Sequence, residues 1–290
     1  MAISDFRRVK KLKVTEVSGQ PTISRTACLK ITSGDDATTG TGEIVLDWSN
    51  IDSKADIGVY DQNNNLLDYY FESFDANNEN AVIWVFKDWV RDGTIQAKIA
   101  YGNGTSDQSV AASTVFSKES NLTGRYLFNE ESGDLLDVSG KDNDGTVNGP
   151  TQGAEGVVDG AYDFDGNDDY INLGTPSGLK FGDEDFSIII WIKPDSVQDY
   201  GEYGLEFLGD STTTTGLKFG INDDDRIFIK AQGESGTASL LYNNFSTNWT
   251  MLTLINDSAN STVYAYRNFD EYTDSESVVV DGNNQDVLIG

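Results

Sequence analysis

Short runs of apolar, aromatic and β-branched residues alternate along this chain with clusters of glycine, asparagine, aspartate and threonine. Runs of this length and composition are typical of β-strands, and the clusters are typical of turns. In the first third, a basic run (RRVKKLKV, from Arg7) begins the series, and predicted strands follow at 27–31, 43–48, 56–61, 67–75, 81–89 and 94–106. The pattern predicts an antiparallel β-sandwich.

The second half continues in the same way around the stretch GAYDFDGNDDYINLG, residues 160–174. Its Asp-Gly-Asn-Asp-Asp cluster predicts a tight turn between two strands, because these residue types tolerate left-handed backbone. Residues 186–192 are apolar on both faces, which favours a central strand covered on both sides. Trp84, Trp191 and Trp249 are predicted to be core residues. Asp223, Asp224 and Asp225 are predicted to form only a hairpin tip.

Residues 106–123 are rich in serine and alanine and lack strand alternation. They predict a linker, with a turn of helix around 110–116. We therefore expect a domain at 1–112, a linker at 113–123 and a second domain at 124–290. The length allows two domains of ordinary size.

Four motifs of the second segment occur in a characteristic order and spacing. They are RYLFNEESGDLLDVSGKDNDGTVNG from Arg125, the stretch 160–174, FSIIIWIKP from Phe186, and NWTMLTLINDSANSTVYAYRN from Asn248. Together they resemble the laminin-G-like, concanavalin-A-like jelly rolls. In that family a final strand pairs beside the first, here around 126–128, yet this sequence stops at Gly290. The last strand is therefore expected to be missing, and a longer natural chain or a neighbouring chain to cover that edge.

The first segment resembles an uncharacterised domain of prokaryotic and viral surface proteins that often precedes laminin-G-like modules. The shared marks are the Arg-Arg first strand, the Trp84-Val85 strand and the Tyr101-Gly102-Asn103 end of the last strand. This resemblance implies architecture only. The overall expectation is an all-β fold class, with two antiparallel β-sandwich domains, the second a concanavalin-A-like jelly roll.

The net charge of the chain indicates the kind of solvent in which the protein works. There are 20 Lys+Arg against 48 Asp+Glu, a net charge of −28, and no histidine. Such a field repels nucleic acid and anionic membranes, and it strains the compact state at low ionic strength. At 1 M salt the Debye length is only about 3 Å, which removes most of the repulsion. The composition therefore favours a halophilic protein; an acidic extracellular β-domain is the alternative.

The single cysteine, Cys28, permits no intramolecular disulfide and is expected to be a small buried hydrophobe. No segment is apolar enough to span a bilayer, so no membrane insertion is expected, and no signal peptide follows the basic start. A surface-type domain without an export signal favours a virus particle assembled in the cytoplasm. If the first methionine is not native, the chain is a fragment of an exported protein.

The absence of histidine excludes Ser-His-Asp and Cys-His catalysis and histidine-bound zinc. A glycosidase carboxylate pair is possible, but no pair stands out among so many acids. Calcium (Ca2+) is the favoured cofactor, because Asp165, Asp168 and Asp169 offer several hard oxygen ligands within one turn. Laminin-G-like domains often hold calcium, and the resemblance adds Asp137 as a partner. The alternative is that these acids are turn formers on a halophilic surface.

Loop aromatics are candidates for stacking on sugar rings. They are Tyr200, Tyr203, Tyr242 and Phe245, which lie among Gly, Asp and Asn. Packing between domains or subunits is the alternative. The basic run from Arg7 to Lys13 favours ion pairs with acidic parts of the protein or of a neighbouring subunit over nucleic-acid binding.

These observations favour a non-enzymatic virion surface protein, a turret, spike or tail component of a virus of halophilic archaea that binds host-cell glycans. Its expected partners are a host surface glycan or glycoprotein and other virion subunits, with a homo-oligomer expected and nucleic acid excluded. One alternative is a haloarchaeal cell-surface adhesin or carbohydrate-binding module. Another is a purely structural capsid decoration protein, and a third is a polysaccharide-degrading enzyme.

Overall fold

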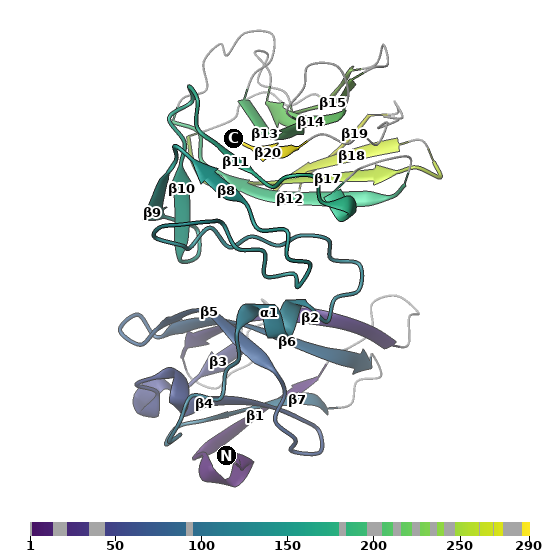
Figure 1. The fold of residues 1–290 in the computed structure, drawn as a ribbon. Helices are drawn as coiled ribbons and strands as arrows, with labels where there is room; N and C mark the ends of the chain where they lie inside the picture. The colour runs from purple at the N-terminus through teal and green to yellow at the C-terminus, as the bar shows by residue number, and fades with distance from the viewer. Residues whose placement is uncertain are drawn as a thin grey trace. The chain divides into compact units, whose positions relative to one another are not determined.

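The structure is a computed structural model of the chain. It describes residues 2–13, 22–34, 44–90, 95–179, 184–195, 205–210, 216–221, 227–232, 237–240, 247–260, 262–268, 270–274 and 286–290. The regular elements of the described part are nearly all strands (Figure 1), which confirms the predicted all-β class. It forms two compact units, Met1–Arg125 with Asp137–Asp142, and Tyr126–Leu136 with Asn143–Gly290. Within the described residues, no helix has the length and apolar character needed to cross a membrane.

The first unit is a β-sandwich. Its elements are η1 (Ile3–Asp5), β1 (Arg8–Lys13), β2 (Thr22–Ser33), β3 (Ile44–Leu46), η2 (Trp48–Asn50), η3 (Lys54–Asp56), β4 (Ile57–Asp61), β5 (Tyr69–Asp75), β6 (Asn80–Val90), β7 (Ile95–Tyr101) and α1 (Ala112–Phe116). One sheet has the strand order β1-β7-β4 and the other β3-β2-β6-β5. Every pairing is antiparallel except β2 with β3, which is parallel. The prediction of a purely antiparallel sandwich is therefore wrong at β3.

The core of this unit lies between the two sheets because strand residues alternate between faces. Ile83 and Val85 from β6 meet Val59 and Ile99 from the opposite sheet, and all four are fully buried. The same alternation corrects the expectation for Cys28. In β2 the residues of the core cluster are Ala27, Leu29 and Ile31, so Cys28 points to the other face, where it is exposed and forms no disulfide.

The outer face of the β3-β2-β6-β5 sheet is covered by α1 and by Arg125. Phe116 of α1 is buried, and its ring centroid lies 5.5 Å from that of Trp84. The Arg125 guanidinium lies 4.4 Å from the Trp84 centroid and 4.1 Å from the Phe116 centroid. Its Nη2 is 3.3 Å from Glu72 Oε1, and Trp84 Nε1 donates to Glu72 Oε2 at 2.7 Å. Trp84 is thus half-buried under an arginine instead of inside the core.

This packing shifts the domain boundary from the expected position. The helical turn predicted around 110–116 is confirmed as α1, but residues 113–123 belong with the first unit and do not form a separate linker. The chain also returns to this unit at Asp137–Asp142, where Val138 N–H donates to the Arg125 carbonyl at 2.9 Å. A return of this kind depends on long-range contacts, which local composition does not reveal.

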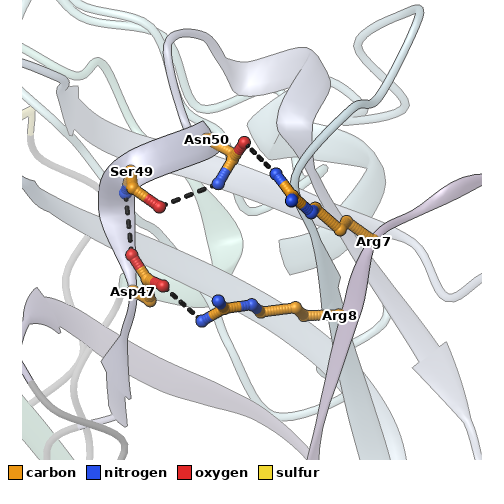
Figure 2. A network of polar contacts seen from close by, with 5 residues as sticks. All are labelled: Arg7, Arg8, Asp47, Ser49 and Asn50. Carbon is orange, nitrogen blue, oxygen red and sulfur yellow. Dashed lines mark hydrogen bonds and ion pairs between the residues drawn. The ribbon is translucent and has the colours of Figure 1, made fainter.

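The basic N-terminal run forms polar contacts with the loop after β3 (Figure 2). Arg8 pairs with Asp47, and Arg7 Nη1 donates to Asn50 Oδ1 at 2.6 Å. Asp47 also accepts from Ser49 N–H at 3.0 Å, and Asn50 Nδ2 donates to Ser49 Oγ at 2.8 Å. At Arg8 the expected ion pair with an acidic part of the protein is therefore present.

The second unit contains the remaining strands. They are β8 (Thr146–Asn148), β9 (Thr151–Glu155), β10 (Gly160–Asp163), β11 (Tyr170–Asn172), β12 (Phe186–Ile192), β13 (Leu205–Asp210), β14 (Gly216–Ile221), β15 (Ile227–Gln232), β16 (Thr237–Leu240), β17 (Thr250–Asp257), β18 (Thr262–Arg267), β19 (Asp270–Asp274) and β20 (Val287–Ile289), with η4 (Ser177–Leu179). One sheet runs β16-β15-β14-β13-β20-β11-β8 and a second runs β12-β17-β18-β19; β10 and β9 form a separate pair. In Figure 1 the two larger sheets lie one over the other.

The stretch 160–174 does form a turn between strands, although those strands do not pair with each other. β10 pairs with β9, whereas β11 pairs with β8 and β20. The turn therefore carries the chain from one sheet to another. Ile171 and Leu173, which follow it, are buried with Leu135 and Ile289 in the core of the unit.

Two expectations for strands of this unit are wrong. Residues 126–128 form no continuous strand: Tyr126 makes a single β-bridge, and Phe128 has φ 57°, a left-handed conformation that interrupts an extended chain. β12 is not a central strand covered on both sides: it is the first strand of its four-stranded sheet. Its alternate side chains Ile189 and Trp191 are 65% and 48% exposed.

Candidate carbohydrate-binding surface

Two strongly exposed apolar side chains of the second unit, Ile189 and Trp191, lie on the outer face of β12. Because directly opposed residues share a face in an antiparallel pair, the register extends this surface across the sheet. Ile189 is opposite Thr253 and Trp191 is opposite Met251; Thr253 is in turn opposite Tyr266, and Ile255 is opposite Tyr264. We call this surface the outer platform. Its members are Ser187, Ile189, Trp191, Met251, Thr253, Ile255, Tyr264 and Tyr266.

The eight residues of the outer platform are uncharged, and acidic residues border them on the same face: Asp257 at the end of β17, and Glu271 of β19, which lies opposite Tyr266. The opposite face of the same strands is the core face, where Leu252, Leu254 and Ala265 are fully buried. Strand alternation therefore separates an apolar inner face from an apolar and aromatic outer face. Trp191, Tyr264 and Tyr266 supply ring faces, and Ser187 and Thr253 supply hydroxyl groups.

Sequence reasoning missed this surface because it assigned Trp191 to the core. The strand FSIIIWI is apolar at every position but Ser187, so its composition does not show which face is solvated. A usable signal lies in the next strand, where polar Thr253 alternates with buried Leu252 and Leu254. That alternation assigns Thr253, and hence its neighbour Ile189, to the solvent face.

The acidic turn at 165–169 brings three of the four predicted metal ligands together. Carboxylate oxygens of Asp165, Asp168 and Asp169 lie within 4.8 Å of one another. Asp165 N–H donates to Asp169 Oδ2 at 2.8 Å, and Asn167 N–H donates to Asp165 Oδ1 at 2.8 Å. The Asn167 N–H, together with its side chain, lowers the pKa of Asp165. A set of charged oxygens on one exposed turn fits a hard cation such as Ca2+.

The fourth predicted ligand, Asp137, lies in the first unit and has a different role. Its carboxylate accepts hydrogen bonds from Arg125 N–H at 3.0 Å, from Ser139 N–H at 2.8 Å and from Ser139 Oγ at 2.8 Å. Asp137 is buried, so these donors replace the water that the charged group would otherwise bind. In the structure Asp137 therefore acts as a hydrogen-bond acceptor at the start of the return segment 137–142.

The predicted sugar-stacking residues, Tyr200, Tyr203, Tyr242 and Phe245, lie outside the described residues, as do Asp223, Asp224 and Asp225. Their assignments stay predictions. Trp249 is half-buried directly before β17.

Two family models match this chain. Residues 53–141 match a domain of unknown function (DUF2341), and residues 165–290 match the concanavalin A-like lectin/glucanases superfamily. No curated protein matches it. The first match extends to residue 141, so like the structure it includes nearly all of the return segment 137–142. The chain thus carries a DUF2341 domain followed by a concanavalin-A-like domain.

Proposed function

We propose that this protein is a non-enzymatic carbohydrate-binding protein of a surface, and that it binds glycans on the outer platform of its concanavalin-A-like domain. The observation that carries the proposal is the aromatic outer platform on a domain of lectin type. Ring faces of tryptophan and tyrosine stack on the apolar faces of sugars, and nearby hydroxyl groups pair with sugar hydroxyls.

Two features support binding without catalysis. The chain has no histidine. Glycoside hydrolysis needs a carboxylic acid with a raised pKa beside a second carboxylate. The pKa shifts found among the described carboxyl groups are downward, as at Asp75 and Asp165, where backbone N–H groups donate to the charged form.

We assign the protein to the surface of a virion of halophilic archaea, as a turret, spike or tail component that attaches to host-cell glycans. The net charge of −28 supports a hypersaline setting, and the pairing of a surface-type domain with a lectin-type domain supports adhesion. A cell-surface adhesin or carbohydrate-binding module of the archaeon would use the same face in the same way.

The test measures binding of the labelled full chain to intact haloarchaeal cells and to immobilised glycans, in molar NaCl. Trp191→Ala removes the most exposed ring of the platform and should weaken binding about tenfold or more. Tyr170→Ala is the matched control, because Tyr170 is 38% exposed but lies in β11 of the other sheet.

Three other outcomes are informative. If Tyr200 and Tyr203 substitutions abolish binding while Trp191→Ala does not, the protein binds glycans through its loops and the platform assignment is wrong. If the folded protein binds neither cells nor glycans, the carbohydrate function fails and a capsid decoration role is favoured. Release of reducing sugars from a bound polysaccharide would contradict the non-enzymatic assignment.

A further inference from the structure

From Ser187 to Ile192, strand β12 (Phe186–Ile192) has no backbone partner on its outer side in the part of the chain that the structure describes. It pairs with β17 along its whole length, from Phe186 opposite Asn256 to Ile192 opposite Thr250. On the other side, Ser187 to Ile192 make no backbone hydrogen bond with any described residue. An edge of this kind presents N–H and C=O groups from every second residue to another strand.

β12 also lacks the features that usually protect an edge. Charged side chains, proline, bulges and short length all discourage strand addition. β12 has seven residues, FSIIIWI, with no charge, no proline and an unbroken register. The edge strand of the first unit's smaller sheet differs: β1 reads RVKKLK and has a register shift at Leu12.

The charge of the chain bears on whether a second copy of the protein can pair with this edge. Two copies of a protein with a net charge of −28 repel each other least when the surfaces that meet carry no charge and salt screens the remaining charges. β12 and the adjoining outer platform form such a surface. The nearest described acids at the start of the strand, Asp185 and Asp257, accept hydrogen bonds from Ser258 and Asn260.

We propose that two copies of this chain pair through β12, antiparallel, about a two-fold axis at Ile189. With the axis at Ile189, residues Ser187 to Trp191 pair with the same five residues of the second copy, and Ile189 lies opposite the partner's Ile189. The same register places Trp191 beside the partner's Ser187 on the outer face. On the inner face it opposes Ile188 to the partner's Ile190, so aliphatic side chains meet on both sides of the sheet.

This pairing joins the two four-stranded sheets edge to edge. In an antiparallel pair, opposed residues point to the same side, so both outer platforms face one direction and stay open to solvent. Two copies therefore present one continuous binding face, and a long glycan could contact both halves with increased avidity. The dimer itself does not depend on glycan binding.

The first experiment measures the mass of the full chain in molar NaCl by sedimentation velocity across a concentration series. We expect a concentration-dependent species of twice the 31.7 kDa chain. Ile189→Lys places two like charges against each other at the two-fold axis and should raise the dimer dissociation constant by about a hundredfold or more. Val157→Lys is the matched control, since Val157 is 44% exposed on the same unit but outside β12, and it should dimerise normally.

A second variant addresses the chance that Ile189→Lys misfolds. In a Cys28→Ser background, Ile189→Cys should form an intermolecular disulfide on mild oxidation, because opposed Cα atoms in an antiparallel pair lie about 4.5–5.5 Å apart. Val157→Cys should not cross-link.

A folded chain that is monomeric at every concentration overturns the proposal. So does a dimer that Ile189→Lys leaves unchanged and Ile189→Cys fails to cross-link, since that dimer would use another surface. The mass measurement uses no glycan, so the two proposals are tested separately: a dimer of the unmodified chain that binds no glycan would remove only the carbohydrate function.

Discussion

At the scale of single residues, Arg125 holds α1 and the return segment against the first unit. Its guanidinium lies over Trp84 and Phe116 and pairs with Glu72, and its side chain is only 26% exposed. We expect Arg125→Ala to lower the free energy of unfolding by about 2–3 kcal/mol, because two ring contacts and a largely buried ion pair are lost. Arg125→Lys should give an intermediate loss, since lysine keeps the charge but not the planar group.

Urea denaturation in molar NaCl, followed by tryptophan fluorescence, measures both losses. Arg8→Ala is the control, because the Arg8–Asp47 pair is solvent-exposed and should hardly move the unfolding midpoint. Equal midpoints for Arg125→Ala and Arg8→Ala would show that the stacked arginine contributes no more than a surface ion pair.

Two buried tyrosines should make the folded protein less stable at alkaline pH. Burial raises the pKa of Tyr162 to about 12, and it also raises the pKa of Tyr69. Tyr162 OH donates to Glu130 at 3.0 Å, and Tyr69 OH donates to the Ile57 carbonyl at 2.9 Å, so the folded state favours the protonated phenol. In the unfolded chain a tyrosine ionises at its ordinary pKa of about 10.

The sign of the pH dependence follows from this difference. Below about pH 10 both states keep the proton, and the contribution of Tyr162 to stability is fully present. Between about pH 10 and 12 only the unfolded state loses it, so stability falls as pH rises. Phenolate absorbance during an alkaline titration should show a late-ionising class of tyrosine that shrinks in Tyr162→Phe. A single ionisation near pH 10 with the fold intact would contradict this prediction.

At the scale of elements, the acidic turn at 165–169 should bind calcium. Removing one carboxylate from three removes both charge and a ligand, so Asp168→Asn and Asp169→Asn should abolish binding. In molar NaCl, calcium at about 100 times its dissociation constant should stabilise the wild-type chain by about 2.7 kcal/mol. Calorimetric titration and thermal unfolding measure this, with exposed Asp163→Asn on β10 as the control. An unchanged melting temperature with no heat of binding would leave these acids as turn formers.

The elements also show what sequence patterns can and cannot predict. The strands of both units were predictable because β-branched runs and turn clusters alternate clearly, as at β4 to β7. The exposure of β12 could not be predicted, because FSIIIWI is apolar on both faces. Only the pairing order of the described strands shows that β12 lies at an edge. Phe128 and the parallel β2–β3 pair were missed for a related reason: backbone angles and strand direction depend on contacts distant in sequence.

Within the candidate site, local spacing was informative only where the ligands are neighbours. Asp165, Asp168 and Asp169 share one turn, so their proximity could be predicted from their positions. The outer platform combines β12 with two strands about 60 to 80 residues later, and its register could not be derived from composition. Asp137 carries the same charge as the turn acids, but its burial and three donors give it a capping role.

At the scale of the whole molecule, the net charge of −28 should make folding depend on salt. Excess like charge destabilises the compact state by self-repulsion, and salt screens that repulsion as the Debye length falls from about 10 Å at 0.1 M to about 3 Å at 1 M. We expect the melting temperature to rise steeply over this range and then more slowly. NaCl and KCl should act alike, since screening depends on ionic strength, whereas an uncharged osmolyte at equal osmolarity should stabilise the chain less. Thermal unfolding in calcium-free buffer keeps this effect separate from the acidic turn. A melting temperature that is independent of salt would show that the acidic side chains are already far enough apart, and would remove the main support for a hypersaline habitat.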